Sequence, residues 1–463
     1  MVGILELDGK TASIGSEQIA ALRNHVRGAI ILPGDADYEG ARRVWNGNID
    51  RRPALIVRCT CTGDVRHAVG FASTNGLLAS VRGGGHSAPG YGTNDGGMVI
   101  DLSPMKMVNV DPVRRTAQTE GGVLWREFDA ATQAHGLATT GGTVTNTGVI
   151  GLTLGGGLGW LMGKHGASVD NVIEMDVVTA DAQLRHVSAT EHPDLFWALR
   201  GGGGNFGIVT SMTFQLHPVG QILGGLVLHP LDRAADMLRF YRDFCATLPD
   251  EAEAHAALLT SPEGVPVGAM LLGYNGDLEE GARVLAPARQ WGQPIADMVA
   301  PMAYADRQAM LDAPNAVHGL HRYWRAAFTE QLTDKFIDML VEGAGRFSSP
   351  LSALILFNVH GAITRVPGNA MAFGARRTQW DFDVVGAWEN GAESATHIAW
   401  VREFWGRLEP HLKGSVYVNH IAADDRPEKV RASFGENHQR LREIKAVYDK
   451  NNLFRMNSNV APA

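Results

Sequence analysis

A single imidazole stands inside a glycine-rich loop early in the chain. Residues 79–95 read Ala-Ser-Val-Arg-Gly-Gly-Gly-His-Ser-Ala-Pro-Gly-Tyr-Gly-Thr-Asn-Asp, so an apolar strand leads directly into three glycines and His86. Glycine has no Cβ, so the backbone N–H groups of this loop can approach an anionic ligand such as a pyrophosphate. A tight turn that happens to carry a histidine would look the same in isolation. Because the loop is not isolated, the pattern predicts a cofactor tethered through His86.

Two further glycine clusters lie in the same half of the chain. The first runs from Gly141-Gly142-Thr143 through Gly148 to Gly155–Gly159, and the second is Gly201–Gly207. Neither fits the G-x-G-x-x-G pattern well, since that motif closes a strand, opens a helix and is followed by an acid that binds the ribose. The clusters therefore predict extended backbone contact with a phosphate-bearing ligand without a Rossmann fold.

Four segments carry a family resemblance: Val81–Ser87, Gly141–Gly159, Asp194–Thr210 and Tyr448–Asn457. On these motifs the chain resembles the berberine-bridge-enzyme-like FAD-linked oxidases of the vanillyl-alcohol-oxidase (PCMH) type over nearly its whole length. The plant relatives are secreted and this chain does not start like an exported protein, so it resembles the bacterial branch. The resemblance implies FAD, covalently bound from His86 to the 8α-methyl carbon of the flavin. It also implies that the following residues bind FAD: Arg82, Gly83, Gly84, Gly85, Ser87, Gly142, Thr143, Thr147, Gly148, Gly155, Gly207, Ile208, Val209 and Asn457.

The chain departs from the family at a second attachment point. Many relatives carry a cysteine two residues after the glycine that matches Gly142, and this chain has Val144 there, which cannot form a thioether. Its three cysteines, Cys59, Cys61 and Cys245, lie outside the glycine clusters. We therefore expect one covalent bond, through His86.

The expected catalytic base also differs from the family pattern. Relatives often place a tyrosine at the end of a Tyr-x-Asn-Tyr strand in front of the flavin, and here the segment reads Tyr417-Val418-Asn419-His420. An imidazole with a pKa near 6.5 accepts a proton at neutral pH more readily than a phenol, so His420 is a candidate base. A hydrogen-bonded histidine in the pocket wall is the alternative. His360, expected on a strand of the substrate sheet, is a second candidate.

Other side chains are candidates for orienting the substrate or for controlling the access of oxygen to the flavin. Tyr417 and Asn419 would orient the substrate or the flavin edge. Tyr323 and Arg325 are pocket candidates, although Arg325 is expected rather to be a solvated or ion-paired surface charge. Thr147 matches the family position thought to regulate oxygen access, but it could also cap the helix expected near Gly148. Four tryptophans could wall a pocket or fill the core: Trp160, Trp324, Trp380 and Trp388.

These residues need two lobes to position them. Strands at 54–58 and 78–82 flank a helical segment at 64–75, and from residue 221 strands alternate with helices near 234–246 and 333–343. We expect an α+β chain: a two-lobed PCMH-type FAD-binding domain at 1–218 (core 37–218) and a substrate domain at 219–415 with an antiparallel sheet backed by helices. The segment 416–463, with a charged helix at 428–448, would return to the first domain.

Composition excludes several classes of protein. The net charge is −8 and 19% of the residues are charged, so there is no basic surface for nucleic acid. No apolar run approaches the length of a membrane span, and the acidic start does not resemble an export signal. Three cysteines predict neither a disulfide framework nor a zinc site, so we expect no metal and a reducing cytoplasm. The oligomeric state is not predicted.

The resemblance implies an FAD-dependent oxidase. It would oxidise an alcohol or a phenolic, polyketide-like small molecule by hydride transfer to flavin N5, with O2 as acceptor and H2O2 as product. One alternative is flavin-dependent oxygenation or oxidative cyclisation in secondary metabolism. The other is a non-redox cyclase or binding protein in which FAD is structural.

Overall fold

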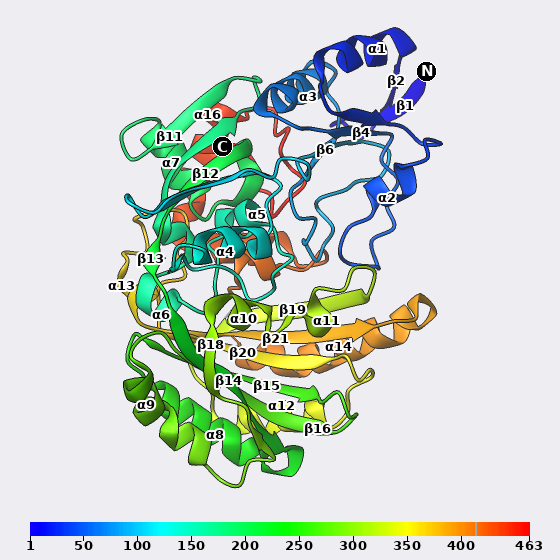
Figure 1. The fold of residues 1–463 in the computed structure, drawn as a ribbon. Helices are drawn as coiled ribbons and strands as arrows, with labels where there is room; N and C mark the ends of the chain where they lie inside the picture. The colour runs from blue at the N-terminus through cyan, green and yellow to red at the C-terminus, as the bar shows by residue number, and fades with distance from the viewer. Residues whose placement is uncertain (413) are drawn as a thin grey trace.

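The computed structural model describes residues 1–412 and 414–463, which form two lobes stacked on each other (Figure 1). The first lobe begins with a four-stranded sheet in the order β3-β4-β6-β5, in which β4, β6 and β5 run parallel. Its apolar strands pack under α1 (Ser16–His25) and α3 (Thr62–Thr74) in one core cluster. The strands are β3 (Ala29–Ile31), β4 (Leu55–Arg58), β5 (Ala79–Arg82) and β6 (Met98–Asp101).

A second sheet in this lobe is antiparallel, in the order β11-β10-β12-β8-β7. The glycine clusters lie in the loops and short helices that connect the strands of this lobe. The strands are β7 (Val108–Asp111), β8 (Thr116–Glu120), β10 (Val172–Val178), β11 (Leu184–Ser188) and β12 (Ile208–Gln215), and the helices are α4 (Trp125–Gln133), α5 (Val149–Leu154), α6 (Met162–His165) and α7 (Pro193–Leu199).

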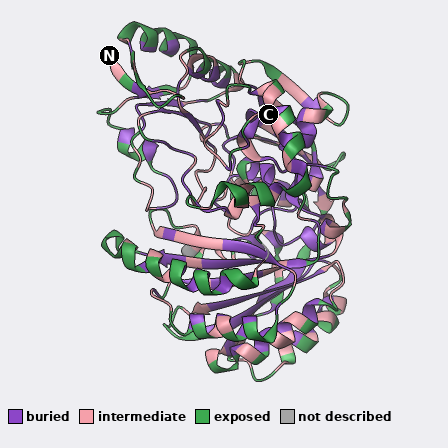
Figure 2. Cartoon of the chain, turned by 180° about the vertical axis from the view of Figure 1, so that it is seen from behind, coloured by how far each residue is buried: buried purple, intermediate pink, exposed green. Residues whose placement is uncertain are grey.

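The second lobe is an eight-stranded antiparallel sheet with helices on the face away from the first lobe (Figures 1 and 2). These helices bury their inner sides and expose their outer sides, which is the pattern expected of amphipathic helices on a sheet. They are α8 (Ala234–Cys245), α9 (Leu278–Gln290), α12 (Asp334–Ala344) and α14 (Ser394–Leu408). The strands are β14 (Gln221–Pro230), β15 (Ala252–Thr260), β16 (Pro266–Tyr274), β17 (Ala296–Asp297), β18 (Ala300–Ala303), β19 (His321–Thr329), β20 (Ala353–Val359) and β21 (Gln379–Trp388). The predicted α+β architecture, with an antiparallel sheet backed by helices, is confirmed.

Side-chain alternation on this sheet decides which residues face the first lobe. Along β21, Phe382 and Val384 lie in the helix-side core, while Asp381 and Asp383 point to the opposite face. Strand β20 alternates in the same way, with Phe357 on the face of the two aspartates. Two carboxylates are thereby placed at the boundary between the lobes.

The C-terminal segment returns to the first lobe. Lys445 of α16 (His438–Tyr448) is fully buried, pairs with Asp449 at 2.6 Å and donates to the carbonyl of Asn205. The sequence predicted one helix over 428–448, but α15 (Pro427–Phe434) and α16 are separate because Gly435 turns the chain with φ +52°. The predicted strand at 417–420 is also wrong: Val418–His420 is a turn of 3-10 helix.

No helix among the described residues combines the length and the apolar character that crossing a bilayer requires.

A buried polar contact links the two lobes. Asp129 of α4 accepts a hydrogen bond from Gln308 Nε2 of α10 (Tyr304–Ala309) at 3.0 Å, and its other carboxylate oxygen has no hydrogen-bond partner. Burial, only partly offset by Gln308, raises the pKa of Asp129 to about 7. The neutral acid is therefore the form that the interface favours.

This pKa gives a testable pH dependence of stability. The folded carboxyl binds its proton up to about pH 7, whereas an unfolded one releases it near pH 4, so folding is favoured at low pH and loses stability as pH rises between these values. Because an asparagine cannot ionise, the free energy of unfolding of Asp129→Asn should fall by about 1–3 kcal/mol less than that of the wild type over this pH range. The check is the thermal midpoint at pH 5 and pH 8, with exposed Asp232→Asn as the control. Equal pH dependence in wild type and Asp129→Asn would contradict the account.

Candidate active site

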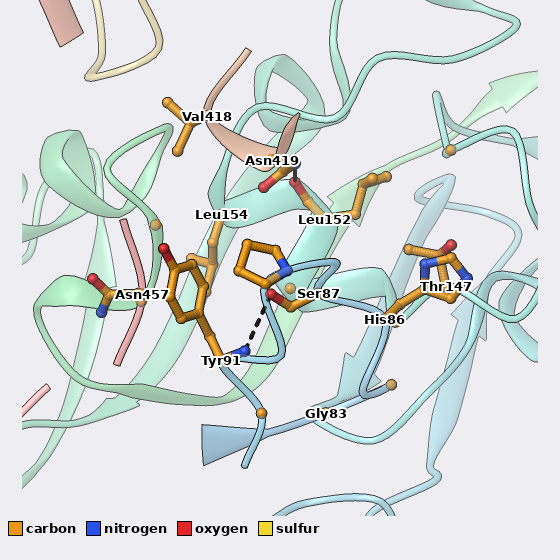
Figure 3. A pocket seen from close by; sticks show the side chains of 18 of the residues that line it. Gly83, His86, Ser87, Tyr91, Thr147, Leu152, Leu154, Val418, Asn419 and Asn457 are labelled. Atoms are coloured by element: carbon orange, nitrogen blue, oxygen red, sulfur yellow. Dashed lines mark hydrogen bonds between the residues drawn. The ribbon is translucent and has the colours of Figure 1, made fainter. Parts of the chain in front are cut away.

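One large cavity lies between the lobes. The glycine loops wall it on one side (Figure 3), and β19, β20 and β21 wall it on the other. Most of the residues predicted to bind FAD line it: Arg82, Gly83, Gly84, Gly85, His86, Ser87, Gly142, Thr143, Thr147, Gly148, Gly207, Ile208, Val209 and Asn457. Four segments distant in sequence thus form one wall. Asn457 Oδ1, in this wall, is buried without a hydrogen-bond partner.

The glycines have two different tasks in this wall. A Cβ on Gly84 would lie 2.5 Å from the backbone nitrogen of Gly148, so the missing side chain lets two loops touch backbone to backbone. A Cβ on Gly204 would meet nothing within 4 Å, so this glycine leaves open space in the cavity wall. The clusters therefore join the loops to one another as well as exposing backbone to a ligand.

Two predicted cofactor residues have a structural role. The Arg82 guanidinium pairs with buried Asp101 at 2.6 Å and donates to the carbonyls of Ala41 and Arg43, so its charge is neutralised although the residue borders the cavity. Gly155 does not line the cavity; a Cβ there would lie 2.1 Å from Asn419 Oδ1.

His86 is held as a neutral ring. Its Nε2 lies 3.0 Å from Asn146 Oδ1, and its imidazole stacks on the indole of Trp45 with centroids 4.0 Å apart. Burial, reinforced by the positive charge of Arg322, lowers the pKa of His86 to about 3. A neutral imidazole keeps a lone pair, which is what a nucleophile or a covalent anchor needs.

Tyr417 and Asn419 attach their segment to the first lobe. The Tyr417 hydroxyl accepts hydrogen bonds from the backbone N–H groups of Gly157, at 2.8 Å, and Leu158, at 3.3 Å. Asn419 Nδ2 donates to the carbonyl of Leu152 in α5 at 2.9 Å (Figure 3). The hydroxyl and amide groups predicted to orient a substrate are therefore engaged with backbone, and they fix the position of His420.

His420 lies against two buried carboxylates. Its Nδ1 is 3.1 Å from Asp381 Oδ2 and 3.1 Å from Asp383 Oδ1. Burial lowers the pKa of His420, but the two negative charges outweigh it and raise that pKa well above 6.5. Burial in turn raises the pKa of Asp381 to about 6. The expectation of an imidazole titrating near 6.5 is corrected: at neutral pH the ring is protonated, because the cluster would otherwise carry two uncompensated charges.

The other predicted side chains lie elsewhere. His360 follows the end of β20 rather than lying on a strand, and its Nε2 contacts the carbonyl of Ala252 at 3.1 Å. Tyr323 is on the helix side of β19, where its hydroxyl binds Asp424. Neither residue lines the cavity. Arg325 is ion-paired with Asp424 and Asp425, as its alternative foresaw, but its side chain is only 13% exposed and is not a surface charge.

Aromatic rings form the remaining wall. Trp324 lines the cavity and lies between Trp45, at 5.9 Å, and His420, at 5.6 Å between ring centroids. A row of rings thus runs from His86 to His420. Trp160 and Trp388 are core residues, and Trp380 packs against the core of the second lobe.

Sequence reasoning missed five residues of the site: Trp45, Asn146, Arg322, Asp381 and Asp383. A signal existed for the aspartates, because Asp381 and Asp383 alternate with the apolar residues Phe382 and Val384, as in a strand with one polar face. No local pattern marked Trp45 or Asn146, since their role depends on contacts with His86.

Comparisons with known proteins find related sequences and a related structure. Residues 53–188 match a family described as FAD binding domain, and residues 416–461 match one described as berberine and berberine like. An FAD-linked oxidoreductase of Dictyostelium discoideum is 28% identical over 94% of this chain and 95% of its own. The (R)-6-hydroxynicotine oxidase of Paenarthrobacter nicotinovorans is 29% identical over 94% of this chain and 97% of its own. The crystal structure of 6-hydroxy-D-nicotine oxidase from Arthrobacter nicotinovorans superposes with a TM-score of 0.86 at 28% identity, covering 95% of this chain and 98% of that one.

The Tyr417 contacts give a prediction for stability. Tyr417→Phe leaves the N–H groups of Gly157 and Leu158 buried without their acceptor, which should destabilise the fold by about 1–3 kcal/mol. Thermal unfolding measures the loss. Tyr448→Phe, which removes a hydroxyl bound to the side chain of Asp194, is the matched control and should cost less. Equal losses in the two variants would contradict the role given to Tyr417.

Proposed function

Because the chain is a berberine-bridge-enzyme-like FAD-linked oxidoreductase, we propose that it oxidises an alcohol or a phenolic small molecule and passes the electrons to O2. The observation that carries the proposal is the pairing, in one cavity, of a neutral imidazole, His86, with an imidazole held by two carboxylates, His420. FAD, when bound, supplies the hydride acceptor at N5 and the route to O2, with H2O2 as product.

The residues of the first lobe fit FAD. The open backbone at Gly203 and Gly204 and the unpartnered Oδ1 of Asn457 offer polar contacts along an otherwise closed wall. We propose that His86 is the single covalent attachment, since Val144 lines the cavity where a second attachment would need a thiol. We further propose that residues 1–218 and 416–463 hold the cofactor and that 219–415 bind the substrate.

Proton removal is assigned to the cluster of His420, Asp381 and Asp383. The Nδ1 atom of His420 faces both carboxylates, so Nε2 is the ring nitrogen left to meet a substrate hydroxyl. The two carboxylates behind the ring hold it as an imidazolium at neutral pH, so the cluster takes up a substrate proton only after it has released one. Since His420 and Asp381 interact strongly, they titrate as a coupled pair. Asp381, with a pKa near 6, is the group that can accept a second proton.

The substrate side of the cavity favours a flat or apolar molecule with one ionisable hydroxyl. Trp324, Ile355, Phe357 and Val385 line it on the side of the second lobe. These side chains exclude water and bury apolar surface of the substrate, while the His420 cluster binds the hydroxyl. Thr147 lines the same cavity, and we propose that its small side chain leaves a path for O2.

The test is the half-reaction without oxygen. Mixing the purified flavoprotein anaerobically with a panel of alcohols and phenols should bleach its yellow absorbance with one of them, and admitting air should restore the colour and yield one H2O2 per product. His420→Gln should slow the bleaching about 10²- to 10⁴-fold, because the cluster loses the titratable ring that meets the substrate hydroxyl.

His360→Gln is the matched control, since it alters a buried histidine outside the cavity, and it should bleach at nearly the wild-type rate. Loss of the rate in His360→Gln rather than in His420→Gln would refute the assignment of the base. Product formed without bleaching would refute a redox role, and label from ¹⁸O2 in the product would indicate oxygenation.

A further inference from the structure

The imidazole of His86 is positioned by residues outside its own glycine loop. We propose that Asn146 is a positioning residue for the covalent attachment of FAD: it holds His86 as the Nε2–H tautomer and so leaves the lone pair of Nδ1 to form the bond. The inference rests on the attachment proposed above. The attachment then depends on a side chain that is itself anchored to the chain of the second lobe.

The amide of Asn146 can be oriented in one way only. Its Nδ2 donates to the carbonyl of Ala316 at 2.7 Å, so its Oδ1 is the atom that lies 3.0 Å from His86 Nε2. A carbonyl oxygen accepts hydrogen bonds and cannot donate them, so Nε2 must carry the hydrogen. Because burial keeps the ring neutral, with a pKa of about 3, the ring has a single N–H. Nδ1 is therefore the nitrogen with the lone pair.

The plane of the ring is fixed as well. Trp45 stacks on the imidazole with an interplanar angle of 21°, and Trp45 Nε1 donates to the carbonyl of Asn315 at 2.7 Å. The guanidinium of Arg322, on β19, lies 3.9 Å over the Trp45 ring. Asn146 and Trp45 are thus anchored to consecutive carbonyls, those of Asn315 and Ala316.

These carbonyls belong to the stretch that leads into β19, the edge strand of the substrate-side sheet. The nucleophile in the first lobe is consequently oriented by chain from the second lobe. It follows that His86 is correctly aimed only when the lobes are docked, so an incompletely folded chain should bind FAD without bonding to it.

The bond-forming step balances with O2 as the oxidant. Nδ1 forms a bond to the 8α carbon of the flavin, and that carbon loses one C–H bond. The departing proton and the proton released by the imidazole, together with the two electrons from the broken bond, reduce O2 to H2O2. The products are the tethered oxidised flavin and one H2O2. Asn146 takes no part in the transfer of electrons; it determines which nitrogen reacts.

The experiment measures acid-stable flavin in protein produced with ample riboflavin. Wild type should keep its yellow colour in the acid pellet, and His86→Ala should lose it. Asn146→Leu, which has a similar volume but no acceptor, should bind FAD and release at least nine-tenths of it on acid treatment. Asn146→Asp keeps an acceptor for Nε2–H and should retain most of the bond. Mass spectrometry of the peptide that contains His86 gives the attached fraction independently.

Thr145→Val is the matched control. It removes the neighbouring side-chain hydrogen bond to Asp312, at 2.6 Å, without touching the imidazole, and should tether as wild type does. Asn146→Ala serves in place of the leucine variant should that fail to fold. Wild-type tethering in Asn146→Leu, or equal loss in the leucine and aspartate variants, would overturn the inference. Wild type without acid-stable flavin would instead refute the attachment at His86 itself.

Discussion

The molecule depends on one short segment, residues 417–420, that is fixed to both lobes. Tyr417 and Asn419 bond to backbone atoms of the first lobe, and His420, one residue further, meets the carboxylates of Asp381 and Asp383 in the second. The segment makes a turn of 3-10 helix rather than a strand, and this turn lets alternate contacts reach opposite lobes. A shift of either lobe would pull the imidazole away from its partners. The cavity between the lobes therefore has a defined width.

Within that cavity two histidines are held in opposite charge states by their neighbours. Burial and Arg322 keep His86 neutral, whereas two aspartates keep His420 protonated despite comparable burial. The rings of Trp45 and Trp324 lie between the two imidazoles and present apolar surface to them. Water therefore does not screen the charges that set the two pKa values. One imidazole is suited to form a bond and the other to take up and hold a proton, although both are the same residue type. This division follows from packing and charge alone.

The sequence predicted what depends on local pattern and on motif. The glycine loops, His86, the alternating strands and the helices behind the second sheet could be inferred, because glycine clusters and the period of apolar residues mark them directly. Features that depend on where a side chain points, or on contacts between residues distant in sequence, could not be inferred. Tyr323 and His360 were expected in the pocket. Tyr323 instead lies on the helix side of β19 and His360 lies beyond the end of β20, because the register of both strands is set by pairing with β21. Asp381 and Asp383 gain their importance only from the segment carrying His420, 37 residues or more away in sequence. The pKa of His420 could not be foreseen without them.

The most direct test of the central claim, that the His420 cluster takes up the proton of the substrate, is the pH profile of anaerobic flavin reduction in wild type and in Asp383→Asn. The rate constant at low substrate concentration should rise with pH through an apparent pKa above 6.5 in the wild type, because the cluster must first release a proton. Removing one negative charge lowers the pKa of His420, so the rising limb of Asp383→Asn should move to lower pH. A limb that stays in place, or that moves to higher pH, would show that the proton is taken up elsewhere.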